Sequence, residues 1–310
     1  MIKIFTPNSW VDYTLLDTGE GEKLERLGEY TFVRPCEDAV WSKTLPKKDW
    51  ENITGKFLSS KEGVKAGWKL DQKAPKKWEM SYKDIKFYAS PTPFRHFGFF
   101  PEQASHWEFI ENKIKEAKKA QDKPLKFLNL FGYTGVASLF ALRAGAEVTH
   151  VDASKQTLDY AKENQKLNSH LELEKLPMRV IEDDVIKFLE REIKRGNKYN
   201  AIVLDPPKFG WGPKGEIWKI EKDLFKLLSL VYKVLSDKPL FVILTSYATD
   251  SSSLALGYAL EDVMRPARNA SSIADAGGDL SGHIEQGELC LKAESNGRFI
   301  SLANTAIWSA

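Results

Sequence analysis

Cysteine is scarce in this chain, whose 310 residues include two cysteines and five histidines. So few cysteines exclude a disulfide-stapled secreted fold, and the histidines, cysteines and acids show none of the spacings typical of metal sites. No apolar run is long enough to span a bilayer, and the first residues lack the pattern of a signal peptide. We therefore expect a cytoplasmic protein that binds neither a metal nor a membrane.

A strong net charge is also lacking, since the formal charge is +2 at pH 7. The whole-chain balance therefore does not indicate a nucleic-acid-binding protein. The charged residues are distributed unevenly along the chain, because the stretch from Lys43 to Lys86 holds twelve lysines and six acids. Four tryptophans lie in or beside this stretch, at positions 41, 50, 68 and 78. Two interpretations remain open: a surface that tracks a phosphate backbone, or a small sheet with solvated lysines and packed tryptophans.

The amino-terminal region shows short strand patterns at Tyr13–Leu16, Leu24–Leu27 and Tyr30–Val33, without a sustained helical period. The segment Ser90-Pro91-Thr92-Pro93 is a natural boundary. We predict a small β-rich domain over residues 1–89, with a potential role in RNA binding, and an α/β domain over residues 90–310. The chain is long enough for both.

The most informative stretch runs from Leu125 to Asp152 and predicts a strand, a turn, a helix and a second strand. Gly132 and Gly135 lie where the first strand turns into the helix, and Gly145 ends the helix. Asp152 follows Gly132 by 20 residues. At this separation a carboxylate can reach the ribose hydroxyls of a bound nucleoside.

This turn lacks the G-x-G-x-x-G pattern that cradles the pyrophosphate of a dinucleotide, which disfavours a nicotinamide oxidoreductase. Instead the bulky Phe131 and Tyr133 flank Gly132, and Thr134 and Gly135 complete the turn. Such a turn suits a nucleoside without phosphates, such as S-adenosylmethionine. The alternative is an ordinary strand-to-helix turn with no ligand.

Two acids, Asp183 and Asp184, follow the next predicted strand, Met178–Glu182, and precede a helix over Val185–Arg195. One acid can accept a hydrogen bond from the adenine amine, and either can cap the helix, since Asp is a preferred N-cap residue. We favour Asp184 for the ligand.

A proline corner follows the strand Asn200–Leu204 and reads Asp205-Pro206-Pro207-Lys208-Phe209. Consecutive prolines cannot continue a central strand, so this corner lies outside the carboxyl ends of the sheet, where ligands bind in such folds. Asp205 and the Pro206 carbonyl can accept hydrogen bonds from an amine, and Phe209 offers a face for stacking. Lys208 either meets a phosphate or lies in solvent.

The combination of these motifs resembles class I S-adenosylmethionine-dependent methyltransferases, in particular the bacterial enzymes that methylate cytosine C5 in 23S ribosomal RNA. The segments that carry the resemblance are L-N-L-F-G-Y-T-G-V-A-S, V-D-A-S-K-Q-T-L-D-Y-A-K-E-N-Q-K-L-N, D-D-V-I-K-F-L and I-V-L-D-P-P-K-F, within Phe94–Tyr247. The resemblance implies a Rossmann-like fold with a mostly parallel seven-stranded sheet and a terminal antiparallel hairpin.

The resemblance also implies roles for individual residues. The turn from Phe131 to Gly135 would hold the methionine part of the cofactor, Asp152 with Ala153 the ribose, and Asp184 the adenine. The candidate catalytic residues, facing the target base, are Asp205, Pro206, Pro207 and Phe209. Further candidates are Gln103, from a segment similar to one that contacts the cofactor in relatives, and Lys208, Tyr247 and Arg95 for the substrate.

One residue of the cytosine-C5 enzymes is missing. Their catalytic thiol follows the fifth strand, predicted here over Pro239–Thr245, and Tyr247 stands in its place. The cysteines are Cys36 and Cys290, far from this position. We therefore expect direct methyl transfer to a heteroatom, with Asp205 orienting the nucleophile and Tyr247 either walling the base pocket or packing under the strand end.

The rest of the chain predicts a helix over Leu254–Met264 and a terminal hairpin of Ile284–Leu291 and Phe299–Trp308. The segment between Asp250 and Asp279, with Arg265 and Arg268, is either a rim loop over the substrate or a connector. The leading interpretation is an enzyme that uses S-adenosylmethionine to methylate a base of RNA, most simply ribosomal RNA. A methyltransferase acting on a protein or small molecule and a noncatalytic RNA-binding assembly factor are the alternatives.

Overall fold

The computed structural model describes residues 2–60, 65–120, 123–247, 252–265 and 280–310. The chain forms two compact units. The α/β unit contains Met1–Ile4, His106–Glu288 and Ala303–Ala310, and the β unit contains Phe5–Ser105 and Leu289–Leu302. The two units are defined by how densely their residues contact one another and do not test where one domain ends and the next begins. The division into domains 1–89 and 90–310 therefore stays a prediction.

The β unit is built on a five-stranded sheet in the order β2-β3-β4-β5-β6, with a separate two-stranded ribbon, β7-β8. The sheet strands are β2 (Tyr13–Gly19), β3 (Glu22–Leu27), β4 (Tyr30–Pro35), β5 (Gly55–Leu58) and β6 (Gly67–Leu70). The ribbon strands are β7 (Trp78–Tyr82) and β8 (Ile85–Ala89), and the short helices are α1 (Lys47–Glu51) and η1 (Pro101–Gln103). The prediction of a β-rich amino-terminal region is therefore confirmed.

The tryptophans of the β unit pack inside it. Trp78 stacks on Phe32 with 5.7 Å between ring centroids, and the Trp68 indole donates a hydrogen bond of 2.8 Å to the Thr92 carbonyl. Trp50 is buried, with its indole nitrogen 3.3 Å from the Asp17 carboxylate. These rings are part of the fold, which favours the packing interpretation of the tryptophans.

A buried ion pair joins β3 and β4. The Arg34 guanidinium donates two hydrogen bonds, of 2.6 and 2.7 Å, to the Glu25 carboxylate, and the Tyr13 hydroxyl donates a third of 2.7 Å. Lys23 lies 3.3 Å from the same carboxylate. Burial raises the pKa of Glu25, but the charges of Arg34 and Lys23 outweigh burial and lower that pKa to about 2.

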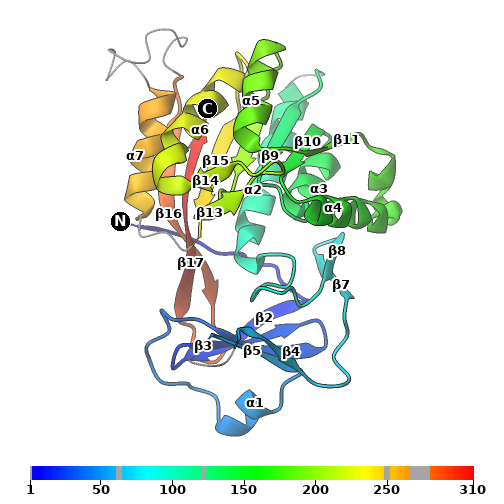
Figure 1. The fold of residues 1–310 in the computed structure, drawn as a ribbon, viewed down its shortest axis with the longest axis vertical. Coiled ribbons are helices and arrows are strands. Elements are labelled where there is room, and N and C mark those ends of the chain that lie inside the picture. Colours follow the sequence, from blue (N-terminus) through cyan, green and yellow to red (C-terminus); the bar gives the residue numbers. More distant parts are fainter. Residues whose placement is uncertain (1, 61–64, 121–122, 248–251, 266–279) are drawn as a thin grey trace. The chain divides into compact units, whose positions relative to one another are not determined.

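The α/β unit holds most of the large sheet, whose strand order is β1-β16-β17-β15-β12-β9-β10-β11 (Figure 1). Its strands are β1 (Lys3–Phe5), β9 (Lys126–Leu130), β10 (Glu147–Asp152), β11 (Met178–Glu182), β12 (Ala201–Leu204), β15 (Phe241–Ser246), β16 (His283–Lys292) and β17 (Phe299–Ser309). The pairings from β11 across to β15 are parallel, and β15 pairs antiparallel with β17. The predicted mostly parallel sheet with its terminal antiparallel pair is confirmed, and the short β1 adds an eighth strand.

Helices cover both faces of this sheet. They are α2 (Ala104–Ala120), α3 (Val136–Arg143), α4 (Lys155–Leu167), η2 (Ser169–Leu171), η3 (Leu173–Lys175), α5 (Val185–Lys194), α6 (Ile220–Val234) and α7 (Ser253–Met264). Leu128 and Leu130 of β9 join the core cluster formed with α5, α6 and α7. Alternate strand residues face opposite sides, so Phe127, 6.5 Å from Phe241 between ring centroids, belongs to the other face.

The sequence analysis did not predict a short ribbon of β13 (Phe209–Trp211) and β14 (Ile217–Lys219), which begins at the last residue of the proline corner. Most of the segment Asp250–Asp279, including Arg268, lies outside the described residues. Among the described helices none is both long and apolar enough to cross a membrane. Within the same residues no three His, Cys, Asp or Glu side chains are grouped to hold a metal ion.

Replacing Arg34 with Ala is expected to lower the free energy of unfolding of the β unit by about 3–5 kcal/mol, because the buried Glu25 charge loses its partner. In the unaltered protein, the contribution of Glu25 is complete above pH 4.5 and is lost as the pH falls toward 2, because its folded pKa lies below its ordinary value. Urea unfolding followed by tryptophan fluorescence measures both effects. The exposed Lys69→Ala is the control, and equal stability of the two variants would contradict the assignment.

Candidate functional site

The register of the parallel strands brings four strand ends to one edge of the sheet. Leu130 of β9 pairs with Leu204 of β12 on one side and Val151 of β10 on the other. Beyond these pairs, the Asp183 amide donates to the Asp152 carbonyl at 3.0 Å, and the Asp205 amide is 3.4 Å from the Leu130 carbonyl. The glycine turn and three of the predicted acids therefore follow adjacent strands.

The turn after β9 has an unusual backbone. Phe131 and Tyr133, neither of which is glycine, have φ angles of 55° and 53°, and Gly135 has a φ of 83°. Left-handed conformations of bulky residues cost of order 1–3 kcal/mol each and persist only where the surroundings impose them. Here the Gly132 amide donates to the Val151 carbonyl at 3.0 Å, which holds the turn against β10. The backbone strain supports a functional turn.

Gly132 is required because a histidine lies directly beneath it. A Cβ atom at position 132 would lie 2.3 Å from Cε1 of His150, whose side chain is fully buried. The strand residue His150 is thus the floor of the turn. His150 was not predicted from the sequence, although a histidine within the strand Glu147–Asp152 was the available signal.

His150 belongs to a buried hydrogen-bonded chain in which each donor can be assigned. The Tyr133 carbonyl can only accept, so Nε2 of His150, 3.2 Å away, carries the proton. Nδ1 then accepts from the Ser138 hydroxyl at 3.0 Å, and the Ser138 oxygen accepts from the Asn129 amide at 3.0 Å. Burial lowers the pKa of His150, which keeps the ring neutral as this chain requires.

The Asp152 carboxylate completes the turn. One oxygen accepts from the Tyr133 amide at 2.9 Å, and the other accepts from the Ser154 amide at 2.9 Å and the Thr157 hydroxyl at 3.0 Å. Ala153, next in the chain, is half-buried. Burial raises the pKa of the Tyr133 hydroxyl to about 12, so this side chain is neutral. The carboxylate is thus held by three hydrogen bonds at the strand end, and its contact with a ribose stays a prediction.

The two acids after β11 have different partners. Asp184 is the N-cap of α5, since its carboxylate accepts from the Lys187 amide at 2.9 Å. Asp183 forms an ion pair with Arg191. Asp184 therefore caps the helix. Its contact with an adenine amine stays a prediction, and that contact would use a lone pair of the carboxylate that does not bind the Lys187 amide.

The proline corner is anchored to the core by a tryptophan. Pro206 is buried, and the Pro207 carbonyl accepts a hydrogen bond of 2.6 Å from the Trp218 indole. The Trp218 ring also lies 5.3 Å from the Phe131 ring between centroids. Asp205 is half-buried, whereas Lys208 and Phe209 are exposed. Trp218 thus touches both the glycine turn and the proline corner.

The other predicted site residues lie elsewhere in the chain. Tyr247 is half-buried and directly follows β15. Gln103 and Arg95 belong to the β unit, where Gln103 is buried and the Arg95 carbonyl accepts a 2.7 Å hydrogen bond from Arg34. The roles predicted for these three residues stay predictions.

Both cysteines are buried and unpaired with one another, and both belong to the β unit. Burial raises the pKa of the Cys36 thiol, which disfavours the thiolate. None of the residues named for the strand-end site is a cysteine.

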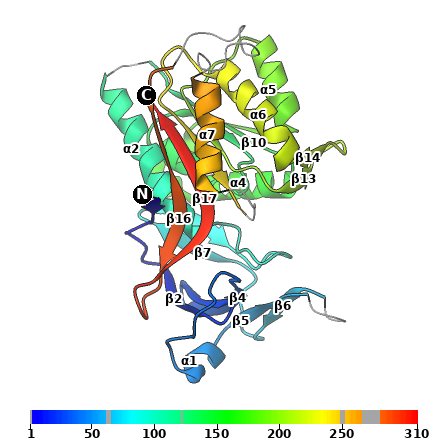
Figure 2. The same ribbon diagram turned by 90° about the vertical axis from the view of Figure 1, so that its left-hand side faces the viewer.

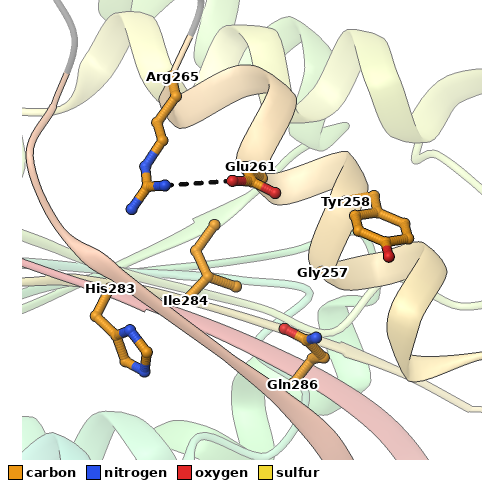
Figure 3. A pocket seen from close by; sticks show the side chains of 7 residues that line it. All are labelled: Gly257, Tyr258, Glu261, Arg265, His283, Ile284 and Gln286. Atoms are coloured by element: carbon orange, nitrogen blue, oxygen red, sulfur yellow. Dashed lines mark hydrogen bonds and ion pairs between the residues drawn. The ribbon is translucent and has the colours of Figure 1, made fainter.

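A separate cavity of about 160 Å³ lies between α7 and β16 (Figure 3). Its lining side chains come from Gly257, Tyr258, Glu261 and Arg265 on the helix side and His283, Ile284 and Gln286 on the strand. Glu261 and Arg265 form an ion pair of 3.2 Å across one end. None of the predicted site residues lines this cavity.

The strand order reverses between β9 and β12, and in open α/β folds ligands generally bind at such a reversal. A SAM-dependent methyltransferase from Agrobacterium tumefaciens has the same fold, with a TM-score of 0.87 and 38% identity over 99% of this chain and 93% of that chain. The chain belongs to the family of S-adenosylmethionine-dependent methyltransferases. The predictions of an enzyme of this family and of its cofactor are confirmed.

Curated relatives carry ribosomal RNA names. The chain is 38% identical over 113 residues to ribosomal RNA large subunit methyltransferase I of Aeromonas hydrophila, a match that covers 36% of this chain and 26% of the relative. It is 36% identical over 165 residues to methyltransferase K/L of Methylococcus capsulatus, covering 51% and 22% respectively. The family model described as conserved hypothetical protein 95 matches residues 109–231. The chain thus spans about a quarter of the length of these two relatives.

The residues of the strand edge fit S-adenosylmethionine. The turn from Phe131 to Gly135 contains no basic side chain for a phosphate, while Asp152 offers a fixed carboxylate for hydroxyl groups. Position 132 admits only glycine, because any side chain there would collide with the buried His150. A turn without basic side chains next to a fixed carboxylate suits a nucleoside that is joined to an amino acid and not to a phosphate.

Removing the His150 imidazole is expected to weaken the turn and the binding of the cofactor. His150→Leu leaves the Tyr133 carbonyl and Ser138 without their partner, at a cost of about 1–3 kcal/mol for each buried group. His150→Gln restores a donor to the carbonyl and is expected to be intermediate. Thermal unfolding and calorimetry with adenosylhomocysteine measure these effects, with the exposed His170→Gln as control.

His150 also makes the stability of the folded protein depend on pH. Because its folded pKa lies below the ordinary value of 6.5, the unfolded chain binds the proton more readily, so stability falls as the pH drops below 6.5. His150→Gln removes this contribution and makes the fall in stability on acidification less steep. A His150→Leu variant with unaltered stability and cofactor affinity would contradict the role of the buried chain.

Proposed function

We propose that this chain methylates a base of large-subunit ribosomal RNA, by direct transfer to a heteroatom, at the edge formed by the glycine turn and the proline corner. The observation that carries the proposal is the position of Asp205, whose amide lies 3.4 Å from the Leu130 carbonyl at the start of the cofactor turn. The names of the relatives support the RNA substrate. Action on ribosomal RNA also agrees with the expected cytoplasmic location.

The chemistry required of the protein is mainly positioning. S-adenosylmethionine supplies an activated methyl group, whose carbon–sulfur bond breaks with the electron pair going to sulfur. Asp205 accepts a hydrogen bond from the amine of the base, aims its nitrogen and offsets the positive charge that the nitrogen gains. The buried Pro206 keeps the corner stiff and excludes water from one side. The surplus proton leaves to solvent.

The absence of a thiol separates this proposal from cytosine-C5 methylation. That reaction needs a thiolate that adds to the pyrimidine ring, whereas Tyr247 follows the fifth core strand, β15, here. A base nitrogen carries its own lone pair and needs no such activation. Heteroatom transfer therefore requires only groups that the corner offers.

Asp205→Ala is expected to lower kcat by about 10²–10³-fold, because one preorganised electrostatic contact to the reacting nitrogen is lost. Affinity for adenosylhomocysteine is expected to change little, since Asp152 and the turn are intact. A radiolabelled methyl-transfer assay and calorimetry measure the two quantities. The exposed Asp237→Ala is the matched control, and normal turnover of the Asp205 variant would refute the role.

The substrate can be identified with ribosomal RNA from a strain that lacks the gene. We expect the purified enzyme to label large-subunit RNA from this strain and not from its parent, in which the site is already methylated. Mass spectrometry of the labelled nucleosides then identifies the atom. Recovery of 5-methylcytosine would overturn heteroatom transfer, and labelling confined to protein or small molecules would overturn the RNA assignment.

A further inference from the structure

The β13–β14 ribbon exposes large apolar side chains on one face only. Phe209 pairs with Lys219, Gly210 with Trp218, and Trp211 with Ile217. Residues directly opposite one another share a face, and successive residues alternate. One face therefore carries Phe209, Trp211, Ile217 and Lys219, and the other carries Gly210 and Trp218.

The two faces have opposite environments. Phe209, Trp211 and Ile217 are 47%, 62% and 57% exposed, whereas Trp218 is 6% exposed. Trp218 holds the inner face of the ribbon against the proline corner and the glycine turn, since its indole N–H donates to the Pro207 carbonyl and its ring contacts Phe131. The turn of the ribbon is held as well, because Glu216 pairs with Lys187 of α5. The outer face is thus a fixed surface, and Figure 2 shows the ribbon extending from the sheet beside α6.

The outer face has the composition of a base-stacking surface. Phe209 and Trp211 meet edge to face, with centroids 5.5 Å apart and planes at 87°. The Lys219 ammonium lies 6.0 Å from the Phe209 centroid, and Lys214 in the turn is exposed. Glu216 is the only acid between residues 206 and 219, and its charge is already paired. Aromatic rings flanked by lysines fit a base and its phosphate.

We propose that this outer face binds an unpaired base of the RNA substrate, adjacent to the base that is methylated at the proline corner. The proposal rests on the proposed function, and the ribbon is continuous in sequence with that corner. A second copy of the chain is a weaker fit. Three partly exposed side chains offer roughly a few hundred Å², below the roughly 800 Å² that each partner of a stable protein interface buries.

Trp211 is the residue to test, because it is the most exposed ring of the face and has no role in the proposed chemistry. Trp211→Ala is expected to weaken binding of a short single-stranded RNA at least about fivefold and to raise KM for ribosomal RNA similarly. Trp211→Phe keeps a stacking face and is expected to recover most of the affinity, whereas Trp211→Leu is not. Affinity for adenosylhomocysteine and kcat are expected to stay at the unaltered level.

The matched control is Tyr258→Ala on α7, because Tyr258 is also 62% exposed. Fluorescence anisotropy gives the RNA affinity, sedimentation the association state, and circular dichroism the folding of each variant. Equal RNA affinity of Trp211→Ala and the unaltered protein, full rescue by Trp211→Leu, or loss of a dimer in Trp211→Ala would each overturn the proposal, as would a failure of the unaltered protein to bind RNA.

These results separate the ribbon from the proposed function. If the unaltered protein binds RNA through Trp211 without methylating any RNA, the proposed reaction fails and the stacking surface stands. If it methylates RNA and Trp211→Ala has an unaltered KM, the reaction stands and the stacking surface fails.

Discussion

The site depends on the parallel pairing of β9 with β10 on one side and β12 on the other. This pairing aligns the ends of strands that are far apart in sequence, so that the turn after Leu130, Asp152 and Asp205 emerge at one edge. It also places the reversal of strand order between β9 and β12, the position at which open α/β sheets generally bind their ligands. A slip of one residue in either pairing would turn the strand-end side chains to the opposite face.

A polar chain inside the core holds that edge in shape. Asn129, Ser138 and His150 lie among apolar strand and helix residues, where an unpaired polar group is costly. Each is satisfied by the next, and the last donor reaches the Tyr133 carbonyl in the strained turn. The low dielectric strengthens these bonds and keeps the histidine neutral. The cost of the left-handed residues at the turn is thus offset by the groups directly below it.

The sequence predicted correctly those features of the fold that depend on adjacent residues. The strand patterns, the glycine turn and the proline corner each consist of a few adjacent residues, and the family resemblance that implied the fold rests on them. His150 and Trp218 were missed because their importance comes from partners distant in sequence: Trp218 touches Phe131, and His150 lies beneath Gly132. Asp184 shows the opposite difficulty, since one short pattern fits both a helix cap and a ligand contact.

Trp218 connects the two halves of the proposed reaction. Its ring contacts Phe131 in the glycine turn, and its indole N–H donates to the Pro207 carbonyl in the corner that we propose faces the base. A two-stranded ribbon is marginal by itself, so this anchor also fixes the exposed rings of β13. Donor, target base and neighbouring base would therefore be positioned from a single buried side chain. Methyl transfer between two bound partners depends on such alignment more than on any acid or base.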